Sequence, residues 1–177
     1  MLLTSHRIFF FLAALLTLQA CSPAYNWRAV PNSDVGYVAT FPDKPAMVTR
    51  TLDLAGLKVP LTLHAAQVNG NYFAVGTVPL EGELQGQTDV LRNALAQALA
   101  NNVQAGSVSP QPMDWLGLQV WAVDLQGTLP SGEAGHAVAR FFENRGVFYE
   151  VVLMGPGKTP TPELQTTWFS GFSLLGQ

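Results

Sequence analysis

Cys21 is the residue of this sequence best placed for a defined chemistry, since it carries the only thiol among 177 residues. It directly follows Leu18-Gln19-Ala20, at the end of an apolar run from Ile8 to Leu18. This run follows Arg7 and is shorter than the roughly 20 apolar residues that span a membrane. We therefore predict that residues 1–20 are an export signal that is removed. No internal disulfide can form, because there is no second cysteine.

Leu18, Ala20 and Cys21 resemble the lipobox of bacterial lipoproteins, in which a leucine and a small residue precede the cysteine at these spacings. Gln19 departs from this pattern, where a smaller residue is commoner. The resemblance implies that Cys21 carries a diacylglycerol thioether and, after cleavage, an N-acyl chain, which together anchor a protein stably. Ser22 stands where an aspartate implies retention in the inner membrane, so the resemblance favours the outer membrane. The alternatives are an ordinary secreted protein and a buried free thiol.

The segment after Cys21 is short and leads directly into apolar residues. Residues 21–26 are predicted to be the lipidated N-terminus and its tether, and residues 27–177 a single globular domain. Only Ser22-Pro23-Ala24 separate the cysteine from Tyr25. At about 3.3–3.6 Å per extended residue, the domain would lie roughly 10–20 Å from the lipid surface. We expect it to face the periplasm and to work close to its membrane.

The charge balance argues against nucleic acid as a partner. The chain has 9 basic and 12 acidic residues and a net charge of −3, which becomes −4 when the leader with Arg7 is removed. The sequence has no block of like charge and no basic face. A partner within the cell envelope is expected instead.

The sequence contains no recognisable catalytic or metal-binding pattern. His64 and His136 fall in different predicted hairpins, and no group of His, Cys and Asp has metal-ligand spacing. Both histidines are expected to be surface or half-buried. No Gly-x-Ser-x-Gly motif occurs, and Gly155-Pro156-Gly157-Lys158-Thr159 lacks the first glycine of a phosphate loop. We expect neither an enzyme nor a cofactor; a hydrolase with an unrecognised site is the least favoured hypothesis.

Two pairs of opposite charges are predicted to face each other across hairpins. Asp53 and Lys58 flank Ala55-Gly56, and Arg140 lies opposite Glu150 if Asn144-Arg145-Gly146 is a three-residue loop with Gly146 left-handed. Cross-strand pairs of this kind stabilise a sheet by about 0.2–1 kcal/mol each. Both pairs are interpreted as structural, and their value is as tests of the strand register.

The second half of the sequence is rich in aromatic residues. We expect them to form the core between the sheet and a C-terminal helix, with an aromatic groove for a lipid tail or a partner segment as the alternative. The residues concerned are Trp115, Trp121, Trp168, Phe141, Phe142 and Tyr149.

The pattern of the first half predicts strands. Runs over 35–41, 47–54, 57–68 and 72–80 are separated by Pro42-Asp43-Lys44-Pro45, by Ala55-Gly56 and by the hairpin dipeptide Asn69-Gly70. Pairing across Asn69-Gly70 sets Leu63 opposite Gly76, which leaves one face of the hairpin apolar.

Two amphipathic helices and three more strands complete the prediction. A helix begins at a Thr88 cap, with Leu91, Leu95 and Leu99 among the residues on its apolar side and Arg92 on its polar side. Strands follow over 116–125, 134–143 and 147–154. A second helix begins at Thr161-Pro162, and its apolar side is formed by Leu164, Trp168 and Phe172. Residues 103–112 stay unassigned. The fold class is therefore α+β, an antiparallel sheet of about six to seven strands flanked by two helices.

Two short motifs and this order of elements resemble the Mog1/PsbP-like α/β sandwich, over about residues 26–175. The motifs are Ala39-Thr40-Phe41-Pro42 and the ending Phe169-Ser170-Gly171-Phe172-Ser173-Leu174. The resemblance implies a binding or assembly protein without a catalytic centre. A non-catalytic accessory module for an envelope component is the leading hypothesis, and a carrier of a small apolar ligand is the alternative.

Overall fold

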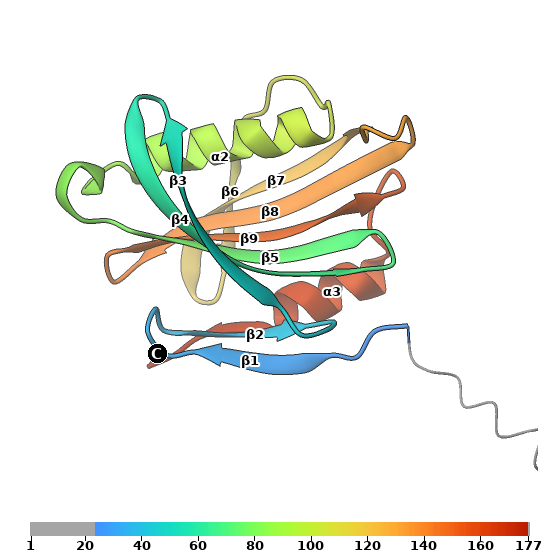
Figure 1. Ribbon diagram of the computed structural model, residues 1–177, viewed down its shortest axis with the longest axis horizontal. Helices are drawn as coiled ribbons and strands as arrows, with labels where there is room; N and C mark the ends of the chain where they lie inside the picture. Colours follow the sequence, from blue (N-terminus) through green and yellow to red (C-terminus); the bar gives the residue numbers. More distant parts are fainter. Residues whose placement is uncertain (1–23, 177) are drawn as a thin grey trace, which may run out of the picture.

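The structure is a computed structural model that describes residues 24–176. It confirms the predicted α+β class: a seven-stranded antiparallel sheet lies between a helix on one face and a second helix with a small sheet on the other (Figure 1). The predicted export signal, Cys21 and the start of the tether lie outside the described residues. No described helix is long and apolar enough to cross a membrane.

The large sheet has the order β3-β4-β5-β9-β8-β7-β6 and is antiparallel throughout. Its strands are β3 (Ala46–Leu54), β4 (Leu57–Val68), β5 (Asn71–Pro79), β6 (Gln111–Trp115), β7 (Leu118–Thr128), β8 (Ala134–Asn144) and β9 (Val147–Pro156).

The first two hairpins have the predicted register. Leu63 pairs with Gly76 and Asp53 with Lys58, whose ammonium lies 2.7 Å from the Asp53 carboxylate. Asn69 and Gly70 both have positive φ, at 52° and 78°, which is the conformation that makes this dipeptide a strong hairpin former.

The small sheet was not predicted. It has the order β1-β2-β10, with β1 (Arg28–Asn32), β2 (Tyr37–Phe41) and β10 (Phe172–Leu174). The predicted strand over 35–41 is β2. The C-terminal helix is shorter than predicted, since it ends at Ser170 and Phe172 belongs to β10. Strand β6 begins at the end of the unassigned segment, at Gln111, and continues to Trp115. The expected strand start at Leu116 is therefore in the turn between β6 and β7.

Helix α2 (Thr88–Asn102) covers one face of the large sheet and buries Leu91, Leu95 and Leu99 (Figure 1). A short 3-10 turn, η1 (Gly82–Leu84), precedes it. The predicted cap is wrong: Gln87 is the N-cap and makes no side-chain capping bond, while the Thr88 hydroxyl bonds the Glu143 carboxylate. Arg92, which the sequence placed on the polar side of this helix, is buried.

Arg92 is buried because a ring and a carboxylate both hold it. Its guanidinium lies 4.0 Å from the centre of the Trp121 ring and 2.7 Å from the Asp89 carboxylate. A guanidinium can use its flat face on the ring and its N–H edge on the carboxylate at the same time. Helix α2 is therefore attached to β7 by a charged side chain as well as by leucines.

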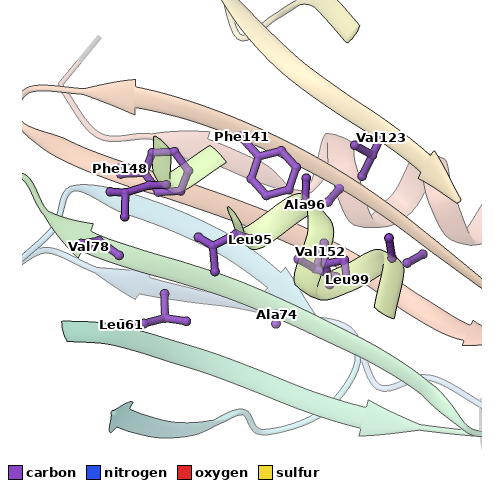
Figure 2. Packing of buried hydrophobic residues seen from close by; sticks show 14 of the residues in the cluster. Leu61, Ala74, Val78, Leu95, Ala96, Leu99, Val123, Phe141, Phe148 and Val152 are labelled. Atoms are coloured by element: carbon purple, nitrogen blue, oxygen red, sulfur yellow. The ribbon is translucent and has the colours of Figure 1, made fainter. Parts of the chain in front are cut away.

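The core beneath α2 is mainly aliphatic, with the rings of Phe141 and Phe148 packed into it (Figure 2). Leu95 and Leu99 face Val78, Phe141, Phe148 and Val152 of the central strands. Burying a leucine, valine or phenylalanine side chain contributes about 1.5–3 kcal/mol, so this layer is a main source of the free energy of folding.

Helix α3 (Pro162–Ser170) lies on the opposite face, beside the small sheet. Its predicted cap is confirmed: the Leu164 N–H donates to the Thr161 hydroxyl over 3.2 Å. Trp168 is fully buried and packs against Phe41 and Phe73, with ring centres 5.2 and 5.4 Å apart. These contacts join α3 to both sheets.

Candidate functional site

A pocket of about 310 Å³ lies between the first described residues and the start of α3. One wall is formed by Tyr25 and Trp27, and the base includes Asn71 and His136. The remaining lining residues are Pro156, Thr159, Pro160, Thr161, Glu163, Leu164 and Thr167. The pocket thus combines aromatic rings and prolines with hydroxyl, amide, imidazole and carboxylate groups.

The aromatic wall is fixed to the rest of the domain. Tyr25 and Trp27 stack with ring centres 5.6 Å apart, and both rings meet Phe73 edge-on. The Asn71 side chain donates to the Tyr25 hydroxyl over 3.3 Å, and the Asn26 N–H donates to the Pro42 carbonyl over 2.8 Å. Tyr25, near the end of the predicted tether, and Trp27, at the start of the predicted domain, therefore form a built wall of the pocket.

In the sequence, Tyr25 is the first bulky residue after Cys21, and Trp27 follows two positions later. Their spacing of two does place both rings on one side of an extended segment. The spacing therefore predicts that the two rings lie on the same side of the chain. It does not predict that a pocket forms between these rings and α3, which begins 135 residues after Trp27.

His136 is buried, contrary to the expectation of a surface or half-buried side chain, and is only 1% exposed. Its Nδ1 lies 3.1 Å from the Gly157 carbonyl oxygen. Burial lowers the pKa of His136, an effect that the bond to Gly157 partly offsets. The imidazole is therefore neutral near pH 7, Nδ1–H donates to the carbonyl, and Nε2 is left as an acceptor. Nε2 has no partner among the described residues.

His64 lies elsewhere, between the two sheets. It pairs with Val75 as predicted, and its Nδ1 lies 2.6 Å from the Tyr37 hydroxyl. Burial lowers the pKa of His64 and raises that of Tyr37 to about 12. The tyrosine therefore stays un-ionised at neutral pH, and its O–H donates a hydrogen bond to Nδ1 of His64. This bond links β2 to β4. This is a structural bond.

Arg140 and Glu150 do not face each other, so their predicted pairing is wrong. Arg140 pairs with Val151 and Phe141 with Glu150, because the hairpin loop is the two residues Arg145-Gly146. A slip of one residue moves a side chain to the other face of a sheet. Arg140 consequently lies on the α3 side and Glu150 on the α2 side.

Glu150 is a buried carboxylate, 4% exposed. It lies over Gly76, and a Cβ at Gly76 would come 3.1 Å from its Oε2. Burial raises the pKa of Glu150 to about 7.

The aromatic cluster predicted from the sequence is divided between the two faces of the sheet. Trp168, Phe142, Tyr149 and Trp115 belong to the core on the α3 side, as expected for a sheet–helix core. Phe141 and Trp121 pack on the α2 side. Trp115 also borders a hollow beside α3 with Arg140. A second hollow, of about 200 Å³, is bordered by Trp121, Phe141 and Phe142. Among the described residues, the aromatic groove that the sequence left open thus has counterparts in these two hollows.

Nothing in the described part of the chain gathers three or more His, Cys, Asp or Glu side chains that could hold a metal ion. Among residues 24–176, no hydroxyl that a base could activate lies within hydrogen-bonding distance of the buried Nε2 of His136. What the pocket binds has to be inferred from its own side chains, since neither a known protein family nor a curated protein matches this sequence.

Proposed function

We propose that this protein is a lipoprotein anchored through Cys21 in the outer membrane, and that its domain binds a component of the cell envelope without catalysing a reaction. The sequence Leu18-Gln19-Ala20-Cys21-Ser22 supports the anchor and its membrane. The pocket behind Tyr25 and Trp27 supports the binding role.

The observation that carries the proposal is the position of this pocket along the chain. Tyr25 is four residues from Cys21, so its backbone can reach at most about 15 Å from an anchored cysteine. The rings that form the wall would therefore be held beside the lipid surface. A binding site in this place favours a ligand that is itself present at the membrane.

A carrier of a small apolar ligand is the second candidate, and the stacked rings of the pocket favour it. The volume of about 310 Å³ is at the lower limit of ligand pockets. An entirely apolar ligand, however, would leave Asn71, His136 and the threonines without new partners, at a cost in affinity. The mixed lining therefore favours a small amphipathic group, such as a headgroup or the end of a chain.

Replacing the anchor residue tests the first half of the proposal. We expect Cys21→Ser to move the protein from the membrane fraction to the soluble periplasmic fraction, because no diacylglycerol can be attached to a serine hydroxyl by thioether formation. Fractionation and mass spectrometry of the N-terminal peptide measure this. Ser22→Ala is the matched control and should stay in the membrane. Full membrane retention of Cys21→Ser would show that the anchor lies elsewhere.

Filling the pocket with a larger side chain tests the second half of the proposal, that the domain binds a component of the envelope there. We expect wild-type protein, purified in mild detergent, to retain a bound molecule in native mass spectrometry, and Thr167→Phe to lose it. Thr166→Phe is the matched control, since Thr166 directly precedes Thr167 in α3 and lies outside this pocket.

The bound mass separates the two candidates. An amphipathic envelope component supports the leading proposal, and a wholly apolar molecule supports the carrier. Loss of the molecule from Thr166→Phe but not from Thr167→Phe would contradict binding in this pocket.

A further inference from the structure

Arg140 of β8 is a cation held by side chains of two other elements, on the far side of α3 from the pocket. Its guanidinium carbon lies 4.3 Å from the centre of the Trp115 ring in β6 and 4.0 Å from that of Phe169 in α3. The two rings are nearly perpendicular, at 84°. The guanidinium therefore rests in a corner formed by two aromatic faces.

The charge of Arg140 has no counter-ion in the described part of the chain. The ion pairs there join Arg28 to Asp43, Lys58 to Asp53 and Arg92 to Asp89, and no acceptor bonds the Arg140 guanidinium. Burial lowers its pKa to about 10, so it stays charged at neutral pH. Rings engage only the flat face of a guanidinium, and its five N–H donors point outward in the guanidinium plane.

Arg92 shows what the same arrangement looks like when it is complete. It too lies over a tryptophan ring, at 4.0 Å, but its N–H edge meets the Asp89 carboxylate at 2.7 Å. Arg140 has the ring contacts without the carboxylate. A partly buried cation without an acceptor is unfavourable, so an acceptor supplied from outside would complete the site.

The surface beside Arg140 has room for such an acceptor. A hollow of about 450 Å³ is bordered by Trp115, Arg140, Gln165, Thr166, Phe169 and Ser170, together with Pro162. Arg140 is the only charged residue of this lining, and one amide and two hydroxyl groups add further donors. A second hollow that shares Arg140 and Gln165 is also bordered by Asp124, which disfavours an anion there.

We propose that Arg140 is the centre of a binding site for an oxyanion, a phosphate or carboxylate group, in the hollow beside α3. The planar fork of a guanidinium matches both groups through two parallel hydrogen bonds. Gln165, Thr166 and Ser170 donate to the remaining oxygens, and the rings of Trp115 and Phe169 accommodate an apolar substituent next to the anion. This site is separate from the pocket at Tyr25 and does not depend on it or on the anchor.

An NMR titration of the full chain in neutral detergent micelles tests the site. Sodium phosphate and sodium benzoate are the soluble probes, with sodium chloride at equal ionic strength as the blank. We expect saturable shifts of the Arg140 Nε–H and Trp115 indole N–H signals, and no shift of the Arg92 and Trp121 signals. Phosphatidylglycerol added to the micelles, against phosphatidylcholine, distinguishes a lipid phosphate from a free one.

Substitutions then distinguish an anion-binding role of Arg140 from a purely structural contact with the rings of Trp115 and Phe169. Arg140→Gln should weaken anion binding by about tenfold or more, since a charge-assisted bond is lost, while Arg92→Gln should leave it unchanged. Arg140→Lys should bind more weakly than wild type, because an ammonium lacks the planar fork. The absence of saturable shifts in wild type with every probe, or equal shifts at Arg92, would overturn the proposal.

Discussion

The Gly127→Ala variant is expected to lose about 3 kcal/mol or more of its free energy of unfolding, because the added methyl group meets backbone that cannot easily move. An ideal Cβ on Gly127 would lie 1.9 Å from the Val103 carbonyl oxygen and 3.2 Å from the Ala105 nitrogen. The same carbonyl accepts a hydrogen bond of 2.6 Å from the Thr128 N–H. The methyl group must therefore break the bond that attaches the end of α2 to β7, or displace the helix from its core.

Urea unfolding followed by circular dichroism measures this loss. Gly76→Ala is the matched control in the same sheet, since a Cβ there meets only the ends of side chains, at 3.1–3.2 Å. We expect the control to lose distinctly less stability. If Gly127→Ala unfolds at the same urea concentration as wild type, the close approach of β7 to the end of α2 is wrong.

Local signals in the sequence were sufficient for the first hairpins. Asn69-Gly70 strongly favours a two-residue turn, and the alternation in β4 allows one register that buries a whole face. Leu63 and Gly76 consequently pair as predicted, and so do Asp53 and Lys58. In both cases the turn and the side-chain pattern specify the same answer.

The hairpin of β8 and β9 shows where such signals fail. Arg145 has a φ of 51° and Gly146 one of 76°, so both residues are left-handed in a two-residue turn. Arginine seldom adopts this conformation, and the sequence therefore favoured a three-residue loop with only Gly146 left-handed. Apolar residues occupy both faces of β9, so its pattern could not correct the error. The single-residue slip separated Arg140 from Glu150.

The small sheet depends on contacts between distant parts of the chain. Strand β10 has three residues, and it pairs with β2, more than 130 positions earlier. Gly171 ends α3 where a Cβ would lie 2.7 Å from the Cβ of Thr40, so the close approach of β2 fixes the end of the helix. Neither feature has a local signal. The pocket behind Tyr25 and the aromatic corner around Arg140 form between the same distant elements, and for that reason the sequence did not show them.

Glu150 supplies the second large effect, which depends on pH. The carboxylate is buried on the α2 side, near Gly76 and the side chains of Leu61 and Leu63. The nearby titratable group is Tyr72, whose pKa is raised by burial first and then by Glu150, while Arg50 opposes the shift. Desolvation alone raises the pKa of Glu150 from 4.5 to about 7.

The direction of the effect follows from proton linkage. Below about pH 4.5 the folded and unfolded chains both hold the proton, and the carboxyl group costs little. Between about pH 4.5 and 7 the unfolded chain releases its proton first, so the free energy of unfolding falls as the pH rises. Above about pH 7 both states are ionised, and the folded state bears a constant penalty of about 3 kcal/mol.

Glu150→Gln removes this ionisation at nearly constant shape. We expect the variant to be more stable than wild type by about 2–3 kcal/mol near pH 8 and to match it much more closely near pH 4.5. Urea unfolding at both pH values measures the difference, and subtracting the variant from wild type cancels the other titrating groups. Glu133→Gln, at an exposed position, is the control and should change stability equally at both pH values. A stability difference between wild type and Glu150→Gln that stays constant with pH would mean that the Glu150 carboxylate is solvated or paired in the folded protein.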